Sequence, residues 1–176
     1  MTFLDNILRL IDMRSFSSVW FWIVLALFWS SRSQTVLGAP FDLIARARRG
    51  KDPQHIDDLN ILVEIHTRRK VTLMRRAGHW IVAFVAAALT AIGVLAFVYR
   101  IEFAQAIVLI LLPMTLVELL ALRLAFRIER ERMVGARLCR ALLTHRFWVQ
   151  ALGVLAIFLT AIWGMMLVMS RSVLGF

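Results

Sequence analysis

Long apolar stretches alternate with charged ones along the chain. Residues 79–99 and 147–170 contain no Asp, Glu, Lys or Arg, and residues 103–122 contain only Glu118. A helix of about 20 apolar residues crosses a bilayer core about 30 Å thick, so each stretch predicts a transmembrane helix. Only three residues separate the stretch 79–99 from the stretch 103–122, which predicts a tight antiparallel hairpin of two helices.

A fourth span is predicted over residues 16–38, although its pattern is less regular. Residues 19–29 are all apolar, but this run alone is too short to cross a bilayer. Val36 and Leu37 resume the apolar pattern, so we extend the helix to Gly38. A proline two residues later then ends it, because proline disfavours the helical conformation in the residue before it.

The polar segments predict further helices outside the hydrocarbon. Residues 3–14 show an amphipathic pattern typical of a helix lying in the membrane interface. An Asp-Pro pair starts a helix over residues 53–76. The third span continues into a helical connection over residues 123–145, with a break at Gly135. The chain is thus predicted to form one membrane domain, residues 1–176, in an all-α integral membrane fold with four transmembrane helices, an N-terminal interfacial helix and helical cytoplasmic connections.

Composition and charge support this fold and orient it. Of the 176 residues, 61% are hydrophobic and 18% are charged, against about 45–50% apolar and about 25% charged in soluble domains, which argues against a soluble enzyme. Sixteen Lys and Arg lie in residues 39–78 and 123–146, against four on the other side. Because cationic residues stay in the cytoplasm, both connections are predicted to be cytoplasmic and both termini periplasmic. The same topology explains the net charge of +10 without a nucleic-acid partner.

Three predicted spans place a polar side chain at similar depth near the cytoplasmic boundary. At about 1.5 Å per residue, Arg32, Glu118 and Gln150 fall roughly 6–9 Å inside it. An ionised group at membrane depth costs about 2.5–3.5 kcal/mol on insertion scales. This cost favours pairing of Arg32 with Glu118, with Gln150 or His79 satisfying the remaining hydrogen bonds. In the alternative arrangement, Arg32 reaches to the interface and Glu118 meets only water or Arg123.

Small residues, a proline and boundary arginines are further candidate positions. Small side chains four residues apart let helix backbones approach closely, a proline kinks a helix, and cations suit anionic head groups. The candidates are Ala83, Ala87, Ala91, Ala156, Thr160 and Gly164 for helix packing, Pro113 for a kink in the third span, and Arg75, Arg76 and Arg146 for lipid head groups.

The chain shows no motif for catalysis. It lacks the His-Glu-x-x-His, Gly-x-Ser-x-Gly, Walker and Cys-x-x-Cys patterns. His79 and His145 lie at similar depth on two spans, as haem ligands of four-helix cytochromes do, but interfacial histidines are more common than ligands. We therefore expect no enzyme activity, no catalytic or metal site and no cofactor, with bound lipid as the one ligand left open.

Several short stretches resemble a family of small bacterial inner-membrane proteins of unassigned role. They are Leu10-Ile11-Asp12-Met13-Arg14-Ser15-Phe16-Ser17, Trp20-Phe21-Trp22, Leu37-Gly38-Ala39-Pro40-Phe41-Asp42, Glu102-Phe103-Ala104-Gln105 and Trp163-Gly164-Met165. They span nearly the whole chain, and the resemblance implies a four-helix protein of the bacterial inner membrane. Some members are labelled as components of the Suf iron–sulfur assembly complex. That label implies a neighbourhood and not an activity, because Cys139 alone cannot scaffold a cluster.

Together these observations predict a non-catalytic accessory, assembly or scaffolding subunit of a larger membrane complex of respiratory or photosynthetic type. Its expected partners are membrane lipids and a protein, either within that complex or as a second copy of this chain. The alternative is a small homo-oligomeric transporter or channel gated near Pro113 and Glu118. The lack of ionisable groups in the outer half of every predicted span disfavours that alternative.

Overall fold

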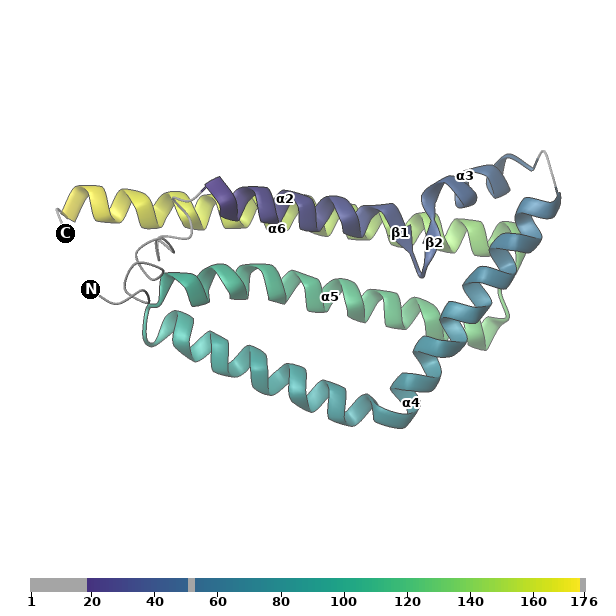
Figure 1. The fold of residues 1–176 in the computed structure, drawn as a ribbon, viewed down its shortest axis with the longest axis horizontal. Helices are drawn as coiled ribbons and strands as arrows, with labels where there is room; N and C mark the ends of the chain where they lie inside the picture. Colours follow the sequence, from purple (N-terminus) through teal and green to yellow (C-terminus); the bar gives the residue numbers. More distant parts are fainter. Residues whose placement is uncertain (1–18, 51–52, 175–176) are drawn as a thin grey trace, which may run out of the picture.

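Helices account for most of the chain that the structure describes. The computed structural model describes residues 19–50 and 53–174. In chain order its elements are α2 (Val19–Gln34), β1 (Thr35–Val36), β2 (Ala39–Pro40), α3 (Phe41–Arg49), α4 (Pro53–Phe97), α5 (Glu102–Glu131) and α6 (Gly135–Leu174). Figure 1 shows α2, α5, α6 and the later part of α4 running along the molecule, while the first part of α4 crosses one end. The predicted interfacial helix over residues 3–14 lies outside the described residues.

Three helices, α4, α5 and α6, are long and apolar enough to cross a membrane. This confirms the all-α membrane fold in its coarse form. Helix α2 has 16 residues, and its apolar part is Phe21–Arg32. At about 1.5 Å per residue α2 extends about 24 Å, less than a bilayer core of about 30 Å. A fourth transmembrane crossing therefore stays a prediction.

The helix predicted to run to Gly38 ends instead at Gln34 and is followed by a two-stranded hairpin. Residues Thr35–Pro40 pair as β1 and β2 around a turn at Leu37 and Gly38, whose φ angles are 46° and 78°. A two-residue hairpin turn of this kind needs positive φ at both central residues. Val36 is buried in a core formed with other elements. The apolar pattern that predicted a longer helix therefore reflects the packing of this hairpin.

The other predicted helices merge into three long ones. Helix α4 joins the predicted helix 53–76 to the span 79–99, α5 carries the third span on to Glu131, and α6 begins at Gly135. Figure 1 shows α4 bending sharply between its first and later parts. Helix α5 continues unbroken through Pro113, which is buried, and shows no comparable bend. The sharp change of direction thus lies in α4 and not at the proline.

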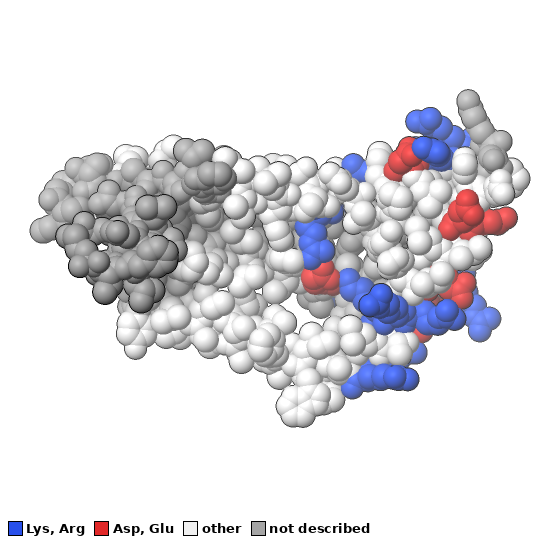
Figure 2. Space-filling model, viewed as in Figure 1, with Lys and Arg blue, Asp and Glu red and all other residues white. Residues whose placement is uncertain are grey.

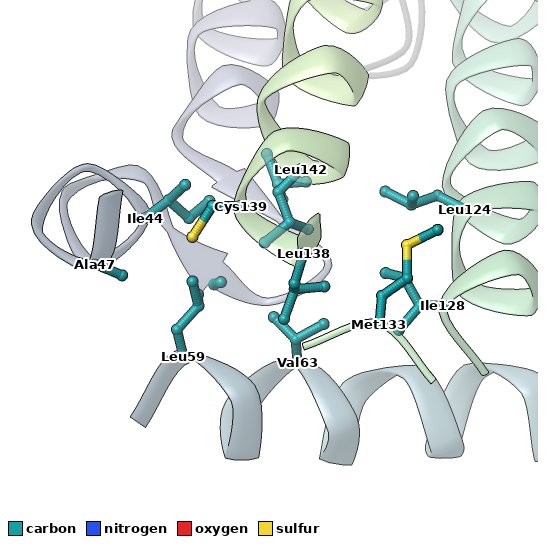
Figure 3. Packing of buried hydrophobic residues seen from close by; sticks show 12 residues of the cluster. Ile44, Ala47, Leu59, Val63, Leu124, Ile128, Met133, Leu138, Cys139 and Leu142 are labelled. Carbon is teal, nitrogen blue, oxygen red and sulfur yellow. The ribbon is translucent and has the colours of Figure 1, made fainter. Parts of the chain in front are cut away.

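Among the residues that Figure 2 colours, the charged side chains lie over one half of the molecule and its tip, and we call this tip the charged end. It consists of the hairpin, α3, the part of α4 before residue 79, the part of α5 after residue 122 and the part of α6 before residue 147. A hydrophobic cluster drawn from these elements forms its interior, namely Val36, Ala39, Ile44, Ala47, Leu59, Val63, Leu124, Ile128, Met133, Leu138, Cys139 and Leu142. Figure 3 shows Leu59 and Val63 of α4 facing Ile44 of α3 and Leu138 of α6. This core positions the hairpin against the first part of α4.

Two glycines at positive φ provide a matched test of the hairpin packing. A Cβ added at Gly38 would overlap the His66 ring, whereas Gly50, with φ 63°, has open space around it. Gly50→Ala should cost about 1–2 kcal/mol of unfolding free energy for backbone strain alone. Gly38→Ala should cost about 1–3 kcal/mol more because of the overlap. Chemical unfolding of the detergent-solubilised variants measures both, and equal losses would contradict packing of the hairpin on α4.

Candidate functional site

One carboxylate joins three helices at the inner edge of the charged end. Glu118 of α5 accepts a hydrogen bond through Oε2 from Lys70 Nζ of α4, at 2.8 Å. Its Oε1 lies 2.7 Å from Nη2 of Arg32, in the last turn of α2. The side chains of Arg32, Lys70 and Glu118 are 35%, 32% and 41% exposed, so the pairs are partly screened by solvent. Each carboxylate oxygen faces one cation, which offsets the cost of desolvating the charges. We call these three residues the charged cluster.

The sequence predicts Arg32 and Glu118 in one polar layer, and the structure brings these two together. Among the described residues, Gln150 and His79 make no hydrogen bond with Arg32 or Glu118. Both are exposed, and neither lines the cavity beside the charged cluster. Helix α4 reaches Glu118 with Lys70 instead, about two and a half turns before His79. The expected roles of Gln150 and His79 are therefore corrected: Lys70 supplies the second partner of the carboxylate.

Lys70 was missed because it lies in a charged stretch that the sequence assigns to a connection. The position of Lys70 on the face of the helix that carries Val63, Thr67 and Val71 indicates that this lysine packs against the other helices. Val63, Thr67 and Val71 are buried on one face of α4, and residue 70 faces the same side at this spacing. A lysine on the packed face of a helix requires an acidic partner, and Glu118 is the carboxylate that the apolar stretch of α5 provides.

A cavity of about 130 Å³ lies beside the charged cluster. His145 and Arg146 of α6 and the hairpin residues 35–38 complete much of its lining. The Arg146 Cζ lies 3.4 Å from the ring centroid of Phe41 in α3. Its Nη1 is buried and has no hydrogen-bond partner among the described residues. Three cationic side chains and one carboxylate therefore surround this cavity.

The neutral form of His145 suits this environment. His145 precedes the apolar stretch 147–170 and is partly buried. Burial lowers its pKa, the nearby Lys70 lowers the pKa further, and Glu118 opposes these effects. The folded structure therefore favours the uncharged imidazole.

A second, wider hollow of about 720 Å³ lies between α4 and the end of α5. Arg75 of α4 binds Glu129 of α5 through two hydrogen bonds of 3.2 and 2.7 Å. The Arg75 guanidinium also lies 6.0 Å from the ring centroid of Phe126. The remaining lining residues are Arg123, Arg127, Arg130 and Arg132. We call this surface the basic hollow, because five arginines surround it with one glutamate. Arg76 is exposed on α4 and does not line it.

The two predicted small-residue stripes differ in their environment. The buried stripe is Ala156, Thr160 and Gly164 of α6, and the exposed one is Ala83, Ala87 and Ala91 of α4. In the most apolar stretch of α4 only 6% of the residues are buried, against 28% in those of α5 and α6. The α6 stripe therefore packs inside the bundle. The α4 stripe does not, so the expectation that both serve internal packing is corrected for α4.

Among the described residues, no three His, Cys, Asp or Glu side chains gather as a metal site. His145 lines the small cavity, whereas His79 lies beside Trp80 on an exposed face of α4. Comparisons of the chain with protein-family models, curated proteins and solved structures find no match. The geometry of the charged cluster and of the basic hollow is therefore the basis for a functional proposal.

Removing either partner of the Lys70–Glu118 pair should destabilise the protein in a coupled way. Lys70→Ala and Glu118→Ala should each lower the unfolding free energy, and the double variant should lose less than the sum. Residues in contact couple by about 0.5–3 kcal/mol, and solvent exposure of these side chains places the value near the low end of that range. Combining Glu118→Ala with Arg76→Ala is the control and should be additive. Additive losses for Lys70 and Glu118 would refute the pair.

Acidification should destabilise the protein through His145. A histidine whose folded pKa lies below its unfolded value of about 6.5 binds its proton more readily when unfolded. The unfolding free energy should therefore fall as the pH drops from 7.5 through about 6.5 towards the lowered folded pKa. His145→Gln should reduce this acid-induced loss, and His55→Gln should leave it in place. Thermal unfolding midpoints across this pH range provide the measurement, and an unchanged profile in His145→Gln would contradict the assignment.

Proposed function

We propose that this protein is a non-catalytic accessory or scaffolding subunit of a larger complex in the bacterial inner membrane, with the charged end in the cytoplasm. The observation that carries the proposal is the basic hollow. Five arginines with one glutamate around an open surface form a docking site for an acidic segment of a partner protein.

The height of the basic hollow favours a protein over lipid head groups as its partner. Arg132 lies ten residues beyond the predicted end of the third span at residue 122, which is about 15 Å along a helix. The head-group layer is about 5–8 Å thick on each side of the hydrocarbon. The hollow therefore begins in the head-group layer, where Arg123 lies, and its far end at Arg132 extends past the lipid surface, where a cytoplasmic face of another subunit can reach it.

The hollow is also held in a defined shape, as a docking surface requires. Arg75 and Glu129 form a two-pronged contact between α4 and α5, and two-pronged arginine–carboxylate pairs fix geometry as well as charge. Phe126 adds an aromatic surface among the cations. Arginine and aromatic residues together are enriched at protein interfaces.

The arrangement near the membrane supports a structural role over a catalytic one. Glu118 is engaged by two cations, so it is poorly placed to accept or release protons during a reaction. The same engagement weighs against the alternative of a homo-oligomeric transporter gated near Pro113 and Glu118. A host complex of respiratory or photosynthetic type remains part of the proposal.

Charge reversal tests the docking surface. Arg123→Glu with Arg130→Glu should release the protein from its complex during native electrophoresis of mild-detergent extracts, because each reversal places like charges opposite an acidic partner. The matched control, Arg48→Glu with Arg140→Glu, makes the same charge change around a different surface of the charged end and should leave co-migration intact.

Three outcomes would overturn this proposal. Equal loss of co-migration in both double variants would indicate a general effect of net charge or folding. Unchanged co-migration in both would show that the basic hollow does not dock the partner. Migration as a homomer alone, together with solute flux in proteoliposomes, would favour the transporter.

A further inference from the structure

The small cavity beside the charged cluster carries unbalanced positive charge. Arg32 and Lys70 already share Glu118, and Arg146 adds a third cation to the lining. With His145 neutral, three positive charges face one negative charge across about 130 Å³. Water can fill such a cavity, but it cannot neutralise the excess charge, whereas an anion can.

Arg146 is held with donor capacity to spare. Its guanidinium stacks over Phe41 at 3.4 Å, which fixes the plane of the group. The Nη1 atom is buried without a hydrogen-bond partner among the described residues, and such unmet donors are costly in a folded protein. A ligand with acceptor oxygens in the cavity would satisfy this donor.

The cavity extends from inside the predicted hydrocarbon boundary, where Glu118 lies, to Arg146 at the edge of the head-group layer. Arg146 directly precedes the apolar stretch 147–170, and Glu118 lies four residues before the predicted end of its span. The Arg32 and Lys70 side chains are about one-third exposed, so the cluster is accessible from solvent or from the head-group layer. A planar guanidinium and an ammonium together are the groups that proteins use to bind phosphate oxygens.

We propose that this cavity binds a phosphate group, with Arg146 as the principal donor and Arg32 and Lys70 as flanking cations. Glu118 pairs with the two flanking cations, and its own negative charge weakens anion binding. The site is independent of the partner surface in the basic hollow, because Arg146, Arg32 and Lys70 are absent from the lining of that hollow.

The thermal unfolding midpoint of the full chain in non-ionic detergent provides the binding readout, since a ligand that binds only the folded state raises it. In one arm inorganic phosphate is titrated against chloride at constant ionic strength. In the other arm phosphatidylglycerol is titrated against the zwitterionic lipid phosphatidylcholine. A saturable rise with inorganic phosphate indicates a soluble phosphate compound as the ligand. A rise with phosphatidylglycerol alone indicates a lipid head group.

The variants give opposite expected shifts. Arg146→Gln should weaken binding about tenfold or more through loss of a charged donor, while Arg146→Lys should weaken it less. Glu118→Gln should tighten binding by roughly tenfold, because it removes a negative charge beside the anion. Arg48→Gln, at an exposed position on α3 outside the cavity, is the control and should bind as the unmodified chain does.

Because Arg146→Gln should weaken phosphate binding and Glu118→Gln should tighten it, the proposal can be tested even where one of these variants folds poorly. No saturable rise in either arm would overturn the proposal. So would equal binding by Arg146→Gln and Arg48→Gln, or weaker binding by a folded Glu118→Gln variant. A merely structural cluster gives no reason for tighter anion binding after the loss of its carboxylate.

Discussion

A carboxylate within an apolar helix needs cations, and this requirement organises the region where the charged end meets the apolar segments. Glu118 lies in the longest apolar part of α5 and is costly there as an isolated charge. Its two oxygens meet Arg32 from the end of α2 and Lys70 from the middle of α4. Two helices that are distant in sequence are thereby tied to α5 at one height. The pairing stabilises this arrangement chiefly because breaking it would leave a partly desolvated charge without a partner.

The hairpin and the bend of α4 are consistent with that arrangement. If α2 continued as a helix to Gly38, the chain would extend several ångströms further along its axis. It turns back instead at Leu37 and Gly38, five residues after the arginine that binds Glu118. The bend in α4 (Figure 1) lets its first part cross the end of the molecule while its later part runs beside the other helices. The hydrophobic cluster of the charged end then fills the space between hairpin, α3 and the first part of α4.

The sequence predicts features that depend on residue spacing along one helix better than features that depend on meetings between helices. The apolar stretches follow from hydropathy, the break at Gly135 from the glycine, and the similar depth of Arg32 and Glu118 from counting residues at a known rise. The end of α2 at Gln34 depends on a tertiary core that Val36 enters, and no local pattern separates that from a longer helix. Lys70 meets Glu118 because α4 crosses α5 obliquely, and crossing angles are absent from a single sequence.

Gln105 is a further case: it donates to the Ala96 carbonyl at 2.9 Å and accepts from Trp163 at 3.4 Å. Two of the stretches quoted for the family resemblance thus meet at this contact, although they lie far apart in the chain.

Matched and unmatched charges have different physical roles in this molecule. Where the chain approaches the hydrocarbon, Glu118 is paired on both oxygens, as the cost of desolvation demands. In the basic hollow, Glu129 pairs with Arg75, and Glu131 pairs with Arg127 at 3.1 Å. The arginines that line the hollow nevertheless outnumber the carboxylates that line it. Clustered like charges repel one another and disfavour the folded chain by itself. That repulsion is relieved when an acidic surface covers the hollow, and it is weakened by salt, as expected for exposed charges. The excess of arginine there is therefore not a source of stability for the isolated chain, and the proposed acidic partner would supply the missing negative charge.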